Sequence, residues 1–174
     1  DDDMYINISS AGVNEDLTEG FANKMVVTTQ YKNLATGKEM DLSQIKQGSD
    51  LMVVHKIELD RDLIYDMELS IEAPVPAGFE LENPRLSSGR KLLTKVQRLT
   101  PSFEEYRDDR YVAAWSLSRG YRSRGIEDNA FFVAYVMRAV TPGSYLVPAV
   151  AIEDMYQPKY RSNTAESHVV VTQD

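Results

Sequence analysis

Residues 66–73, "DMELSIEA", decide the fold class. Apolar side chains at positions 67, 69 and 71 alternate with polar side chains at positions 66, 68, 70 and 72. Successive side chains of a β-strand point to opposite faces of its sheet. This period of two therefore predicts a strand with one face in the core and one face in water.

Similar short segments recur along the chain, separated by turn residues. They occupy residues 24–33, 51–59, 110–118, 129–140, 145–154 and 167–173, with 4–9 as a candidate first strand. Residues 129–140, "NAFFVAYVMRAV", are apolar on both faces, which predicts a central strand packed on two sides. Seven or eight short strands of this kind predict an all-β fold, an antiparallel β-sandwich.

Two segments add detail to this prediction. Leu92, Leu93, Val96 and Leu99 recur at helical spacing, so we expect one short α-helix over residues 87–99. Pro142 and Gly143 fit the two central positions of a type II turn, which predicts a hairpin over residues 130–152. Pro148 cannot donate to a strand ladder, so it implies an edge or a bulge.

Length and composition are those of one globular domain over residues 1–174, with 43% hydrophobic and 26% charged residues. The formal charge of −8 opposes binding to nucleic acid or to an anionic membrane surface. No apolar run is long enough for a membrane helix, which argues against direct membrane insertion. The first residues, "DDDMYINISS", resemble a cut into a longer chain, so we expect an excised domain.

Catalytic chemistry finds little support in the sequence. The chain has no cysteine and two histidines, His55 and His168, both in predicted strands. His55 falls on an apolar face, where a hydrogen-bonded core histidine is a better interpretation than a metal ligand. The carboxylates of residues 60–62 and 153–154 fit solvated turn charges better than a calcium loop. We therefore predict a protein that is not an enzyme and that has no cofactor and no metal.

Residues 104–115, "EEYRDDRYVAAW", form the densest charged stretch. Arg107 and Arg110 flank Asp108 and Asp109, and arginine can bond carboxylates bidentately. One interpretation is a local ion-pair network that stabilises the start of a strand. The other is a functional surface for a neighbouring domain.

Several stretches in matching order resemble one family. They are "VPAGFELENPRL" (75–86), "EEYRDDRYVAAW" (104–115), "YVMRAVTPGSYLVPAVAIEDMYQPKYRS" (135–162) and "SHVVV" (167–171), and residues 25–59 fit the leading strands. Together they resemble the carboxy-terminal, tenth macroglobulin-like domain of bacterial alpha-2-macroglobulins. The combination of "YRDDR", "RAVTPG" and "EDMY" followed by a proline is specific, whereas each part alone is weak.

The resemblance implies a sandwich module of a large periplasmic, lipid-anchored protein that traps proteases through a thioester in another domain. In that family the terminal domain packs on the thioester domain, and a Met-Tyr pair helps to shield the thioester from water. Met155 and Tyr156 match that pair. The partners implied are the thioester domain and other domains of the same parent chain, and target proteases through the parent.

Two alternatives remain open at this point. Met155 and Tyr156 could fold onto their own sandwich as a local plug. The domain could also be a stand-alone ligand-recognition or adhesin sandwich of a cell-surface protein, which would bind a ligand by itself.

Overall fold

The computed structural model describes residues 18–63, 66–82, 99–118 and 129–173. The candidate strand at 4–9 and the expected helix at 87–99 lie outside these residues, apart from Leu99. Leu99 is buried, and its carbonyl accepts a hydrogen bond from Trp115 Nε1 at 3.2 Å. No helix in the described part is long and apolar enough to cross a membrane.

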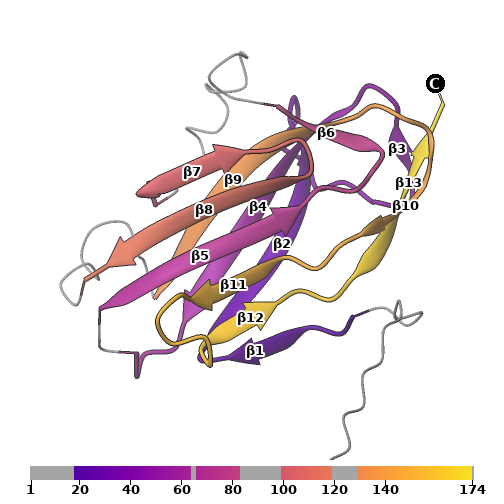
Figure 1. Cartoon of the computed structure of the whole chain (residues 1–174). Helices are drawn as coiled ribbons and strands as arrows, with labels where there is room; N and C mark the ends of the chain where they lie inside the picture. Colours follow the sequence, from indigo (N-terminus) through magenta and orange to yellow (C-terminus); the bar gives the residue numbers. More distant parts are fainter. Residues whose placement is uncertain (1–17, 64–65, 83–98, 119–128, 174) are drawn as a thin grey trace, which may run out of the picture.

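The described residues form three sheets (Figure 1). The six-stranded sheet has the order β1 (Phe21–Asn23), β12 (Arg161–Asn163), β11 (Ala151–Asp154), β5 (Met67–Pro74), β8 (Arg110–Leu117) and β7 (Phe103–Tyr106). The four-stranded sheet has the order β2 (Met25–Asn33), β4 (Asp50–Leu59), β9 (Ala130–Ala139) and β6 (Phe79–Glu82). These two sheets form the layers of a β-sandwich, as predicted.

A smaller, three-stranded sheet lies at one end of the sandwich (Figure 1). It has the order β10 (Gly143–Val147), β13 (Ser167–Thr172) and β3 (Ile45–Lys46). In the described part of the chain every strand pair is antiparallel except β13 with β3. The predicted antiparallel sandwich is therefore confirmed, with this one parallel pair added.

The alternation in residues 66–73 has the predicted effect. Met67, Leu69 and Ile71 are buried, while the side chains between them lie toward water. Strand β5 pairs with β11 on one side and with β8 on the other, so it occupies the middle of the six-stranded sheet. β9 is central in the other sheet, between β4 and β6, as its two apolar faces predict.

The predicted hairpin over residues 130–152 is wrong. Both edges of β9 are already occupied by β4 and β6, so β10 cannot pair with it. After β9 the amides of Val140 and Thr141 donate to the Gly78 carbonyl, and the chain crosses to the three-stranded sheet. Gly143 has φ of 152°, far from the value of about +80° that a type II turn requires. Pro148 lies after β10, an edge strand, in the link to β11.

One hydrophobic core joins all three sheets, with Trp115 against Phe131 and Tyr111 stacked on Tyr135. His55 is fully buried in this core. Its Nδ1 lies 2.9 Å from the Thr29 hydroxyl, and its Nε2 lies 3.4 Å from the Tyr135 hydroxyl. Burial lowers the pKa of His55 to about 3, so the imidazole is neutral. The prediction of a hydrogen-bonded core histidine is confirmed.

Candidate functional site

The turn at residues 154–160 joins β11 to β12, at the end of the sandwich opposite β10 and β13 (Figure 1). Backbone hydrogen bonds attach it to the strands on both sides. The Met155 amide donates to the Glu68 carbonyl of β5 at 2.8 Å, and the Asp154 amide donates to the Tyr160 carbonyl at 3.0 Å. The Tyr160 amide closes the turn by donating to the Gln157 carbonyl at 2.9 Å. The backbone of the turn is therefore anchored.

Asp154 holds the first part of the turn with its side chain. Its Oδ1 accepts hydrogen bonds from the amides of Tyr156, at 3.0 Å, and Gln157, at 3.2 Å. This is the local side-chain-to-backbone bonding by which aspartate stabilises turns. The residue is only 1% exposed. The interpretation of residues 153–154 as solvated turn charges is therefore wrong for Asp154, although Glu153 is exposed.

Met155 and Tyr156 project from this anchored backbone into water. The Met155 side chain is 48% exposed, and Tyr156, at 82%, is the most exposed of the large hydrophobic residues in the described part of the chain. The alternative of a plug folded onto its own sandwich does not fit these exposures. The two residues form an adjacent apolar pair on the surface, which we call the Met-Tyr pair.

Neighbouring elements fix the same end of the molecule. The Asn23 side-chain amide donates to the Lys159 carbonyl at 2.7 Å, which ties β1 to the turn. Lys24 pairs with Asp60 at 2.9 Å and lies 3.6 Å from Asp62, so residues 60–62 carry solvated turn charges, as interpreted. The Asp60 pKa is lowered by the backbone hydrogen bond from Asp62 and by Lys24.

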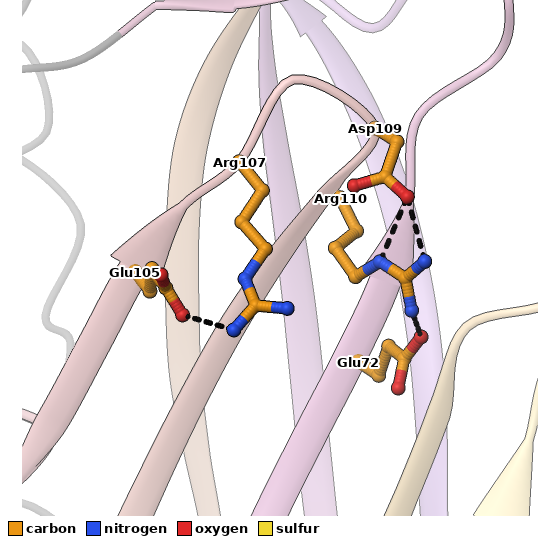
Figure 2. Close-up of polar contacts among 5 residues, drawn as sticks. All are labelled: Glu72, Glu105, Arg107, Asp109 and Arg110. Carbon is orange, nitrogen blue, oxygen red and sulfur yellow. Dashed lines mark hydrogen bonds and ion pairs between the residues drawn. The ribbon is translucent and has the colours of Figure 1, made fainter.

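The charged residues 107–110 lie at the tip of the hairpin formed by β7 and β8 (Figure 2). Arg110 donates to Asp109 Oδ2 through Nε at 3.0 Å and through Nη2 at 2.6 Å, and its Nη1 bonds Glu72 of β5. The hydrogen bonds from Arg110 lower the pKa of Asp109, and those to Asp109 raise the pKa of Arg110. Arg110 therefore links the hairpin to the neighbouring strand.

Arg107 belongs to a separate pair rather than to a common network. Its Nη2 lies 2.8 Å from Glu105 Oε2, and this contact raises the pKa of Arg107 (Figure 2). Asp108 is exposed, and among the described residues it has no hydrogen-bond or ion-pair partner. Of the four predicted residues, Asp109 and Arg110 thus pair with each other, Arg107 pairs with Glu105, and Asp108 has no partner among the described residues. Their use as an interdomain surface stays a prediction.

Among the described residues no group of three histidine or acidic side chains lies close enough to hold a metal ion. His168 is exposed on β13, far along the chain from the buried His55. The Met-Tyr pair on its anchored turn is therefore the best candidate site for binding another protein surface.

Sequence reasoning missed Asp154, but the signal was present. Ile152 is buried on β11, and a period of two places Asp154 on the same inner face. An aspartate on an inner face, directly before a turn that contains a proline, indicates a carboxylate that bonds the turn amides.

Comparison with known proteins identifies the family of this chain. The model of the Bacterial Alpha-2-macroglobulin MG10 domain family matches residues 24–159, which include the Met-Tyr pair. An alpha-2-macroglobulin of Escherichia coli (strain K12) is 28% identical over 161 residues, covering 86% of this chain and 9% of the relative. One from Xylella fastidiosa (strain Temecula1) is 30% identical over 183 residues, covering 97% of this chain and 10% of the relative.

Solved structures of alpha-2-macroglobulins contain a domain with the same fold. A crystal structure of Salmonella alpha-2-macroglobulin reacted with methylamine superposes with a TM-score of 0.74 at 28% identity, covering 92% of this chain and 10% of that one. Trypsin-activated alpha-2-macroglobulin from Escherichia coli gives 0.71 at 27% identity, covering 88% of this chain and 11% of that one. The chain spans about a tenth of the length of these relatives. The chain belongs to the bacterial alpha-2-macroglobulin MG10 domain family.

Proposed function

We propose that this domain is a non-enzymatic module of a bacterial alpha-2-macroglobulin that packs on the thioester domain of the same parent chain. Through the Met-Tyr pair it shields the thioester from water until a protease is trapped. The observation that carries this proposal is the exposure of Met155 and Tyr156 on a turn whose backbone is fixed.

Exclusion of water is a chemical requirement of this function. An acyl-sulfur bond is lost to hydrolysis when water reaches it, and a closed apolar cover slows that reaction. The thioether of Met155 and the ring of Tyr156 offer apolar surface next to each other, without a charged group on either side chain. Single exposed hydrophobic residues are ordinary, whereas a contiguous apolar patch marks an interaction surface.

The relatives support the same function. A Salmonella homologue has been solved after reaction with methylamine, and an Escherichia coli homologue after activation by trypsin. An amine that reacts with the protein and a protease that activates it both fit a parent that keeps a reactive acyl group until cleavage. We extend this property of the relatives to the parent of the present chain as part of the proposal.

The test uses the full-length parent with the double substitution Met155→Ala and Tyr156→Ala. We expect its thiol to be released by spontaneous hydrolysis faster than in the wild type, measured with a thiol reagent over time at neutral pH. Phe103→Ala is the matched control, because Phe103 is 51% exposed on the edge strand β7 and is absent from the turn. Thiol release at the wild-type rate in the folded double variant would remove the shielding function.

The stand-alone ligand-recognition function makes a different prediction. It requires the domain to bind a peptide, glycan or host protein by itself, whereas the proposed function requires binding to a purified thioester domain. Loss of binding to the thioester domain on Tyr156→Ala supports the proposed function, and unchanged binding opposes it. A periplasmic, lipid-anchored parent that captures proteases belongs to the same proposal and is tested by cell fractionation and by protease capture.

A further inference from the structure

Asp154 is a buried carboxylate that packing alone does not explain. It is 1% exposed at the end of β11, on the inner face of the strand with Ile152. Aspartate is almost never fully buried without a partner, because removing its charge from water is costly. Among the described residues no cation pairs with it. Its hydrogen bonds must therefore account for its position.

Within the part of the chain that the structure describes, the hydrogen bonds of the carboxylate go to the turn. Oδ1 accepts from the amides of Tyr156 and Gln157, and the Asp154 carbonyl also accepts from the Gln157 amide at 3.2 Å. The Met155 amide is bonded to Glu68 of β5. Three consecutive amides, from Met155 to Gln157, therefore have acceptors, and Asp154 supplies the acceptor for two of them.

The second carboxylate oxygen of Asp154, Oδ2, is not available to a docking partner. Oδ2 is fully buried, and no donor of the described residues lies within hydrogen-bonding distance of it. A protein surface that docks on the turn cannot reach an atom without solvent exposure. Asp154 is therefore not a recognition group for a partner, and its contribution is the geometry of the turn.

That geometry decides where the exposed pair points. Tyr156 is 82% exposed, so contacts with its own sandwich do little to orient its ring. The orientation must come from the backbone that carries the side chain, and the amide of Tyr156 is bonded to Asp154 Oδ1 at 3.0 Å. Loss of this acceptor would free the turn to rotate Tyr156 away from its docking position.

We infer that Asp154 is the positioning residue of the Met-Tyr pair, because its buried carboxylate holds the turn that aims Met155 and Tyr156 at the surface they cover. The inference rests on the proposed function and adds a residue that does not itself touch the partner. It requires the acceptor oxygen rather than the negative charge. We therefore expect asparagine at position 154 to keep the turn in place, and alanine to fail to do so.

The experiment uses the full-length parent chain and four variants: Asp154→Ala, Asp154→Asn, the double alanine variant of the Met-Tyr pair, and Ser162→Ala as a control. Ser162 is buried on β12 and accepts a hydrogen bond from the Val27 amide at 3.1 Å, so its loss removes a buried bond outside the turn. Two quantities are measured. They are the rate of spontaneous thiol release and the hydrogen–deuterium exchange of a peptide covering residues 153–160.

We expect Asp154→Ala to increase both the thiol release and the exchange of this peptide. Asp154→Asn should match the wild type in both measurements, and Ser162→Ala should leave the exchange of the turn unchanged. If Asp154→Ala does not yield folded protein, Asp154→Ser replaces it, because its shorter hydroxyl accepts more weakly in the same kind of turn. The expected changes are then smaller and in the same direction.

The two measurements separate failure of this inference from failure of the proposed function. Faster thiol release in the double variant, with wild-type behaviour of Asp154→Ala, overturns the inference and leaves the shielding function standing. Wild-type thiol release in the double variant overturns the shielding function. In that case faster exchange in Asp154→Ala but not in Asp154→Asn still supports positioning of the turn, and unchanged exchange overturns it. Asn and Ala variants that behave alike also overturn it, because the acceptor would not matter.

Discussion

Acidification should destabilise this domain through His55 before most carboxylates titrate. The His55 ring is fully buried, and its polar neighbours are the hydroxyls of Thr29 and Tyr135. Both hydroxyls are neutral near neutral pH, so neither supplies a negative charge that would stabilise a protonated ring. Burial lowers the pKa of His55 from 6.5 to about 3. The unfolded chain therefore binds a proton at a pH where the folded chain does not.

The direction and the magnitude of the pH effect on the free energy of unfolding follow from this difference in proton binding. Stability is fully present above the unfolded pKa of 6.5 and is lost as the pH falls from there toward the folded pKa of about 3. Each pH unit in this window removes about 1.4 kcal/mol, so a change from pH 8 to pH 5 removes about 2 kcal/mol. Total stabilities of domains are about 5–15 kcal/mol, so the loss is easily measured.

The assay is urea unfolding of the 174-residue chain at several pH values between 8 and 5. His55→Gln should lose this part of the pH dependence, because an amide gains no proton in the range, although its stability at pH 8 is lower. His168→Gln makes the same substitution at an exposed position and should keep the dependence. If the wild type and His55→Gln lose the same free energy between pH 8 and 5, the argument from burial is refuted.

Two further substitutions test the packing and the surface charges. A Cβ at Gly78 would lie 2.2 Å from Tyr145 Cε2, so Gly78→Ala should destabilise the fold by about 1–3 kcal/mol in urea unfolding. In the Tyr145→Ala background the same change should cost little, and equal costs in both backgrounds would contradict the clash. Arg110→Gln removes the exposed pairs with Asp109 and Glu72, so we expect a small decrease in Tm at low salt that disappears at high salt. A large decrease that persists in high salt would show that these pairs contribute more than exposed ion pairs do.

Strand positions were predictable because burial on one face imposes a period of two. Residues 66–73 show this at its clearest, since the inward positions of β5 are buried as the pattern predicts. Residues 129–140 were predictable for a different reason, because apolar residues on both faces indicate a strand packed on two sides, and β9 is buried along most of its length. The partner of each strand was not predictable in the same way. Residues 143–147 pair with β13 instead of β9, because β9 has both edges occupied, and a local sequence pattern does not record which edges are free.

The candidate site was also predictable only in part. The family resemblance identified Met155 and Tyr156, and the charge pattern identified Arg110 as a pairing residue. Neither one indicated that Arg110 would bond Glu72 across the sheet or that Arg107 would pair with Glu105 instead. The contact between Arg110 and Glu72 depends on the register between β8 and β5, which lie far apart along the chain.

The turn at residues 154–160 combines two features that are each unfavourable in free energy. A buried, partly unsatisfied carboxylate is unfavourable, and so is a large hydrophobic side chain held in water. Asp154 and Tyr156 bring both unfavourable features into one short turn, and neither feature improves the packing of the sandwich. Phe103 and Leu146 are also exposed, but they lie on edge strands of two different sheets, and single exposed hydrophobic residues are ordinary for a surface. A rigid turn that keeps two apolar side chains exposed gains stability only when another surface covers them, and this is the state that the proposed packing on the thioester domain provides.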